Sequence, residues 1–220
     1  MESLETQLRE DTAARGVADA AGLPTLADEG LQVAGFPVER VALWRGDLTT
    51  LRADAIVNAA NAQMLGCFQP GHACIDNAIH AGAGPRLRAE CDVHMRQQGH
   101  PEPTGHALLT DGYALPARHV IHTVGPIVHD ALTENHRAQL TQSYRSILDT
   151  AGTAGLHTVG LCSISTGVFG FPKEPAARIC LDTVAAWMSE NPSSELQVII
   201  SVYADIDERT YRSALEEMAA

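Results

Sequence analysis

Short apolar segments alternate along this chain with longer segments of helical composition, and this alternation limits the possible folds more than any other feature. The apolar segments are Glu39–Arg45, Asp54–Ala60, His106–Asp111, His119–Val124, Thr158–Ile164 and Gln197–Tyr203. Thr158–Ile164 is apolar almost throughout, as is typical of a strand buried on both faces of a sheet. Helices are expected at 4–21, at 72–98 with a break at 82–85, and at 132–151, 174–189 and 207–218. The pattern predicts a layered α/β/α domain.

The chain of 220 residues is long enough for one domain with an appendage. Residues 1–36 are expected to form an N-terminal helical extension, and residues 37–220 the domain itself. The composition, 45% hydrophobic and 19% charged, is that of a soluble globular protein and excludes collagen-like or largely disordered chains. No apolar run approaches the roughly 20 residues that a membrane helix needs.

Charge and cysteine content narrow the range of partners. The formal net charge is −12, and Lys173 is the single lysine. Duplex binding requires clustered Lys and Arg, so no nucleic-acid partner is expected. A small anion remains possible, because helix N-termini and Gly-rich loops hold phosphate without lysine. Five cysteines suit a disulfide framework poorly, and residues 1–10 carry no secretory signal, so we expect a cytoplasmic protein.

Three segments that follow predicted strands carry unusual residues. They are Gly46-Asp47-Leu48-Thr49, Asn58-Ala59-Ala60-Asn61 and Ser165-Thr166-Gly167-Val168-Phe169-Gly170. Ligands collect at such strand ends in layered α/β folds. Each segment also has a structural interpretation: Asp47 can cap a helical turn, the asparagines can satisfy loop backbone, and 165–170 can be a turn with positive φ. Residues 165–170 precede a helix, however, and the free amides there suit a diphosphate.

The segment from Cys67 to Cys74 has the spacing Cys-x4-His-x-Cys, with His72 between the two thiols. Two thiolates and an imidazole suit Zn²⁺. The cysteines can instead be ordinary buried thiols, with His72 capping a helix. A closed structural zinc site would need a fourth ligand, for which His80, Cys91 and Cys162 are candidates. Three protein ligands would leave one position open, as in a catalytic site.

Taken together, Gly46-Asp47-Leu48, Val57–Asn61 and Ser165–Gly170 resemble the macrodomain family over roughly residues 38–218. The Cys-x4-His-x-Cys motif is similar to that of the zinc-dependent branch of the family. The resemblance implies a three-layer fold with a mixed central sheet of about six strands. It also implies ADP-ribose as the ligand, one zinc ion per chain, and removal of mono-ADP-ribose from protein side chains as the activity.

The resemblance implies a role for each matching residue. Asp47 would accept a hydrogen bond from the adenine amine, Asn61 would contact the ribose at the bond that is cut, and Phe169 would lie close to that ribose. The implied ADP-ribose-binding residues are Asp47, Leu48, Asn61, Ile75, Asp76, Ser165, Thr166, Gly167, Val168 and Phe169, and the implied zinc ligands are Cys67, His72 and Cys74.

Asn61 and Asp76 are the expected catalytic residues: Asn61 would orient the ribose, and Asp76 is a candidate base. Zinc would either activate a water molecule or orient a ribose hydroxyl. His80 lies one helical turn after Asp76 and is interpreted as a surface residue, with support of Asp76 as the alternative.

Two other functions stay open for the sequence. One is an ADP-ribose reader with a purely structural zinc, and the other is a hydrolase of a free ADP-ribose derivative. Some bacterial proteins of this branch act on a lipoyl carrier protein that a sirtuin-type transferase has modified. The sequence does not identify this partner.

Overall fold

The computed structural model of this protein describes residues 2–69 and 72–219. Its main sheet has six strands in the spatial order β2-β8-β7-β4-β6-β5. These strands are β2 (Val41–Arg45), β4 (Ala55–Ala60), β5 (Ala107–Asp111), β6 (His119–Val124), β7 (Thr158–Leu161) and β8 (Gln197–Val202). Neighbouring strands are parallel except β5, which runs antiparallel to β6. The predicted mixed sheet of about six strands is therefore confirmed.

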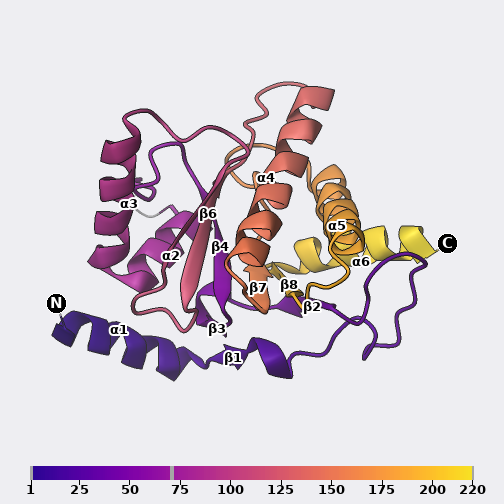
Figure 1. Cartoon of the computed structure of the whole chain (residues 1–220), viewed down its shortest axis with the longest axis horizontal. Helices are drawn as coiled ribbons and strands as arrows, with labels where there is room; N and C mark the ends of the chain where they lie inside the picture. The colour runs from indigo at the N-terminus through magenta and orange to yellow at the C-terminus, as the bar shows by residue number, and fades with distance from the viewer. Residues whose placement is uncertain (1, 70–71, 220) are drawn as a thin grey trace.

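Helices cover both faces of this sheet, which confirms the three-layer architecture (Figure 1). The helices are α2 (Ile75–Ala83), α3 (Pro85–Gln98), α4 (Glu134–Thr153), α5 (Lys173–Glu190) and α6 (Asp205–Ala219). In Figure 1 the pair α2 and α3 lies to one side of the strands, and α4 and α5 lie to the other. Helix α6 packs against α5 and β8. No helix among the described residues combines the length and apolar character needed to cross a bilayer.

The central strands are apolar because helices cover both of their faces. Ile56 and Val57 of β4, Val159 of β7 and Ile199 of β8 have no exposed surface. Gly160 in β7 is needed for close packing: a Cβ there would come within 2.7 Å of side-chain atoms of Leu48 and Leu51. The short 3-10 helix η2 (Leu48–Thr50) therefore lies directly against the sheet.

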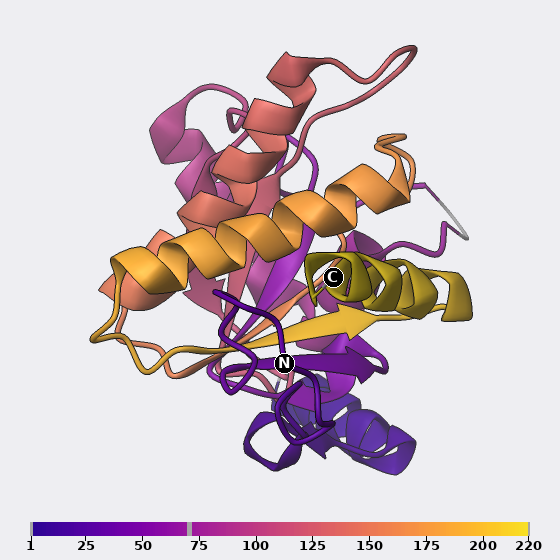
Figure 2. The same ribbon diagram turned by 90° about the vertical axis from the view of Figure 1, so that its right-hand side faces the viewer.

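The N-terminal segment differs from the predicted helix over 4–21. Helix α1 (Glu2–Arg15) ends earlier, because Gly16 has a φ of +88°. The chain then forms the short strand β1 (Ala18–Asp19), which pairs in parallel with β3 (Leu51–Arg52), and the 3-10 helix η1 (Ala20–Gly22). Figure 2 shows α1, in indigo, beside the main domain rather than within its layers. It packs mainly against α2 and η2, and Glu5 forms an ion pair with Arg86 of α3. The boundary between residues 36 and 37 stays a prediction.

Two other predicted elements begin or end three residues away from the predicted position. The helix expected from residue 72 begins at Ile75, because Cys74 is its N-cap. Its expected break is confirmed at Gly84, which ends α2 with a φ of +85° and is followed by Pro85 as the first residue of α3. The strand expected over 158–164 ends at Leu161, because the chain turns away from the sheet before Ser165, whose φ is +64°.

Candidate functional site

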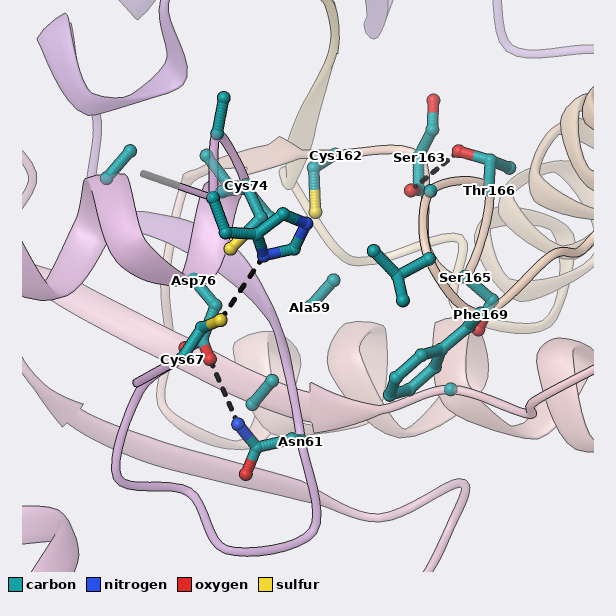
Figure 3. A pocket seen from close by; sticks show the side chains of 18 of the residues that line it. Ala59, Asn61, Cys67, Cys74, Asp76, Cys162, Ser163, Ser165, Thr166 and Phe169 are labelled. Carbon is teal, nitrogen blue, oxygen red and sulfur yellow. Dashed lines mark hydrogen bonds between the residues drawn. The ribbon is translucent and has the colours of Figure 1, made fainter. Parts of the chain in front are cut away.

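A cavity of about 1010 Å³ opens at the carboxyl ends of the parallel strands. The loops after β2, β4, β7 and β8 contribute to its walls, together with the start of α2. Every residue that the sequence predicted for ligand or zinc binding lines this cavity. Figure 3 shows Cys67 and Cys74 on one side of it, and Ser165, Thr166 and Phe169 on the other. The fold therefore brings the predicted residues together, while their individual roles stay predictions.

Asp47 combines the two interpretations of its loop. Its Oδ1 accepts hydrogen bonds from the backbone N–H and the Oγ1 of Thr49, at 2.9 and 2.7 Å, so it caps η2 as the structural interpretation predicted. Its Oδ2 accepts a hydrogen bond from Nη1 of Arg15 at 2.7 Å. Asp47 is also one of the residues that line the cavity, and its side chain is partly exposed. The capping role thus leaves Asp47 available to a bound ligand.

The loop from 165 to 169 presents hydrogen-bond donors to the cavity. Within the described chain, the backbone amides of these five residues have no hydrogen-bond acceptor. The hydroxyl of Ser165 is buried and equally without a partner among the described residues. Gly125 permits this arrangement, because a Cβ there would come within 2.1 Å of the Ser165 Oγ. Several unpaired amides in one tight loop form a site for an anion.

The side chains of Cys67, His72 and Cys74, which we call the cavity triad, converge on one point. Their potential ligand atoms all lie within 4.8 Å of one another, and the Cys67 Sγ is 3.2 Å from the His72 Nδ1 (Figure 3). The Cys74 Sγ accepts a hydrogen bond from the backbone N–H of Asn77 at 3.4 Å. Burial raises the pKa of the Cys74 thiol, and the neighbouring Cys67 adds to the effect. The donor set and its convergence fit a sulfur-rich zinc site.

Asp76 lies at the start of α2 with its carboxylate almost fully buried. The Asn58 side-chain amide donates to Oδ1 at 2.8 Å, and that of Asn61 donates to Oδ2 at 3.3 Å. Burial raises the pKa of Asp76, and the hydrogen bond from Asn58 opposes this shift. Asn61 also donates to the carbonyl oxygen of Gly66 at 3.1 Å. These bonds fix the carboxylate and the amide side by side on the cavity wall.

His80 is buried, so its interpretation as a surface residue was wrong. Its Nε2 lies 3.6 Å from the Asp76 Oδ1, and its side chain is 1% exposed. Burial, with a smaller effect of Arg88, lowers the pKa of His80 to about 4. The sequence held a signal for this position, because His80 follows Asp76 and Ile79 and precedes Ala83 on the inner face of α2.

His80 belongs to a second group of donors, with Cys91 and His122, which we call the buried triad. Its potential ligand atoms also lie within 4.8 Å of one another, so by residue type and distance it could hold a metal. Spacing along the chain did not reveal this group, because His80, Cys91 and His122 lie on three different elements. From the sequence, His80 and Cys91 were candidates for a fourth ligand of the cavity triad, and they lie instead with His122. The third candidate, Cys162, donates from its Sγ to the carbonyl oxygen of Val57 at 3.5 Å.

Both ring nitrogens of His122 have partners. Its Nδ1 lies 3.1 Å from the Asn58 Nδ2, and its Nε2 lies 2.9 Å from the Thr110 Oγ1. Because an amide nitrogen only donates, Nδ1 accepts and the neutral ring carries its proton on Nε2. Burial lowers the pKa of His122 to about 3 and raises that of Cys91 to about 12. In this arrangement His122 offers no free lone pair to a metal.

The family described as Macro domain matches residues 57–180 of the chain. This protein belongs to the macrodomain family. The match includes most of β4, the cavity triad, Asp76 and the loop from 165 to 169, all of which contribute to the cavity, whereas Asp47 and the loop after β8 lie outside the match. The macrodomain fold and the family suggested by the sequence motifs are both confirmed.

Named relatives and solved structures resemble this macrodomain over most of its length. A protein-ADP-ribose hydrolase of Treponema medium is 47% identical over 79% of this chain and 66% of the relative. One of Staphylococcus aureus is 44% identical over 82% of this chain and 68% of the relative. The chain thus spans about two thirds of the length of these relatives. The Trypanosoma brucei macrodomain in complex with ADP-ribose is 34% identical, with a TM-score of 0.72 over 96% of this chain and 86% of that one.

Proposed function

We propose that this macrodomain is a zinc-dependent hydrolase that removes mono-ADP-ribose from modified protein side chains. One observation carries the proposal: a thiol and imidazole triad, a buried carboxylate and a loop of unpaired amides line the same cavity. Two relatives at 47% and 44% identity carry the name protein-ADP-ribose hydrolase. The structural likeness to a macrodomain solved with ADP-ribose further supports the ligand.

Cys67, His72 and Cys74 are the residues that would hold the zinc ion. Their sulfur and nitrogen donors suit Zn²⁺, and three protein ligands on a cavity wall leave room for a further one from the substrate side. When bound, zinc supplies Lewis-acid chemistry at the sugar end of the cavity. The buried triad is the less suitable site, because the His122 nitrogens already bond Asn58 and Thr110.

The other cavity residues position the substrate. The amides of residues 165–169 bind the diphosphate, and Asp47 accepts a hydrogen bond from the adenine amine. Asn61 orients the ribose whose anomeric carbon is attacked. Asp76, held by Asn58 and Asn61, takes the proton from the attacking water, the bond between the anomeric carbon and the protein side chain breaks, and the leaving side chain takes up a proton. Fixing the sugar against these groups supplies much of the rate enhancement, because positioning alone can contribute about 7–11 kcal/mol.

The decisive experiment measures release of ADP-ribose from a mono-ADP-ribosylated protein with and without a zinc chelator. We expect the chelator to stop turnover while the far-ultraviolet circular dichroism stays native, and added zinc to restore turnover. A reader with structural zinc would bind ADP-ribose without turnover and unfold with the chelator. Turnover of an acylated ADP-ribose but of no modified protein would instead favour a hydrolase of a free derivative.

A mono-ADP-ribosylated lipoyl carrier protein is part of the proposal as one substrate, on the strength of the sequence resemblance. A cytoplasmic location is part of it as well, because thiols must stay reduced to bind zinc, and all five cysteines are free in the structure. Side-by-side assays with carrier protein and with other modified proteins test the first point.

A further inference from the structure

The N-terminal segment runs along the loop that carries Asp47. The Arg15 Nη1 donates to the Asp47 Oδ2 at 2.7 Å, and three residues later β1 pairs with β3, which directly follows η2. Asp19 of β1 adds an ion pair with Arg52 of β3 at 3.6 Å. Arg15 and β1 therefore contact the two ends of the stretch 47–52, which lies more than 30 residues further along the chain.

The guanidinium of Arg15 contacts three side chains. Besides its bond to Asp47, Nη1 lies 3.4 Å from the Thr49 Oγ1, and Nη2 donates to the Thr12 Oγ1 at 3.1 Å. Thr12 is 2% exposed and fixes the inner face of α1 against the domain. Arg15 itself does not line the cavity. It can affect a ligand there only through Asp47.

The hydrogen bonds already present limit what Asp47 can accept. A carboxylate has about four lone-pair positions. Two donors from Thr49 occupy Oδ1, and Arg15 occupies one position of Oδ2. Among the described residues these are the donors to the Asp47 carboxylate, so one acceptor position remains on a residue that lines the cavity. An exocyclic amine, as in adenine, matches this acceptor, whereas a 6-oxopurine such as hypoxanthine presents an oxygen to it.

We propose that Arg15 is a positioning residue of the nucleotide site and makes the N-terminal segment a determinant of base preference. It holds the remaining acceptor of Asp47 toward the base, so that the site selects a 6-aminopurine over a 6-oxopurine. The inference rests on the proposed binding of ADP-ribose in this cavity. It assigns to α1 a function in recognition in addition to packing.

The test measures, by calorimetry on the full-length protein, the Kd for ADP-ribose and for its hypoxanthine analogue, inosine diphosphate ribose. In Arg15→Ala we expect about five- to tenfold weaker binding of ADP-ribose, within the range of coupling between contacting residues. Binding of the hypoxanthine analogue should change less than about twofold, so that base selectivity falls. Arg15→Lys should recover part of the ADP-ribose affinity and of the base selectivity. An ammonium group keeps the positive charge but lacks the planar set of donors of the guanidinium.

Two further variants distinguish an effect on the position of Asp47 from a general loss of structure. Arg9→Ala is the matched control, since Arg9 lies on the same helix but donates to the carbonyl oxygen of Tyr113 at 3.1 Å. It should leave both Kd values within about twofold of wild type. In an Asp47→Ala background, Arg15→Ala should have no further effect on ADP-ribose binding. In turnover assays, Arg15→Ala should raise KM and leave kcat unchanged.

The outcomes distinguish this inference from the function on which it rests. Wild-type protein that fails to bind ADP-ribose would overturn the proposed function and this inference with it. Wild-type binding with an unchanged Kd in Arg15→Ala would overturn the inference alone. Equal losses for both nucleotides, or a loss that persists in the Asp47→Ala background, would do the same.

Discussion

The cavity triad and the buried triad contain the same two kinds of donor but differ in their surroundings. The cavity triad has two thiols and an imidazole, half-buried on the wall of the cavity, within eight residues of sequence. The buried triad has two imidazoles and a thiol from α2, α3 and β6, all enclosed in the core. Its histidines stay neutral because burial lowers their pKa values. The two triads are therefore alike in residue type and differ in accessibility and in the hydrogen bonds that their members already make.

The largest expected difference between the triads is in zinc content and turnover. Cys67→Ser replaces a thiolate ligand with a poor one, so we expect zinc to fall from near one per chain to a small fraction. Turnover should fall on the order of 10² to 10³-fold, because the Lewis acid is lost. Elemental analysis of the purified protein and the ADP-ribose release assay measure the two effects.

The matched control is Cys91→Ala, which alters the buried triad. The variant protein should keep the zinc ion of the cavity triad. Zinc that is retained in Cys67→Ser and lost from Cys91→Ala would show that the metal belongs to the buried triad, and would contradict the comparison.

The next largest difference is in stability without metal. His122→Ala removes a fully buried ring, leaves a cavity in the core, and breaks the hydrogen bonds that the ring makes with Asn58 and Thr110. We expect a loss of about 2–4 kcal/mol in the free energy of unfolding. His72→Ala, on the cavity wall, should cost less than about 1 kcal/mol under the same conditions. Urea denaturation in the presence of chelator measures both, and equal losses would remove the distinction between a structural and a metal-binding triad.

The smallest expected effect is the share of the pH dependence of stability that a single histidine of the buried triad contributes. Burial lowers the pKa of His80 to about 4 and that of His122 to about 3, against about 6.5 in the unfolded chain. Between about pH 6.5 and 4 the unfolded chain thus binds more protons, so stability falls as the pH falls. Each histidine contributes up to about 1.4 kcal/mol per pH unit.

Urea denaturation between pH 6.5 and 5 measures this slope, before the ordinary carboxylates titrate. His122→Gln should flatten it, because one of the two buried imidazoles is gone. A variant with the slope of the wild type would show that the pH dependence arises elsewhere in the chain.

Much of the fold followed from periodicity, and the errors have local causes. The six apolar segments became the six strands of the main sheet, since strands covered on both faces must be apolar. Helix α1 is shorter than predicted because Gly16 adopts a positive φ that ends it. The composition of 16–21 gave no warning that this stretch would pair with β3, since the short parallel pair depends on a partner more than 30 residues away.

In the site, too, features that depend on residues close in sequence were predictable, and features that depend on residues distant in sequence were not. The cavity triad was predictable because its members lie within eight residues, where spacing alone limits geometry. The burial of His80 was misjudged because its nearest polar neighbour, Asp76, is itself buried, and that depends on Asn58 from the neighbouring strand.

The sequence by itself determined which segments become strands and helices, which loops carry polar residues, and that two thiols and an imidazole share one loop. Those properties depend on residues close together along the chain. Only the tertiary structure decided that His80, Cys91 and His122 share a pocket in the core, and that Arg15 contacts Asp47. Strand order and helix docking bring these residues together, and both depend on packing across the whole domain rather than on any local pattern.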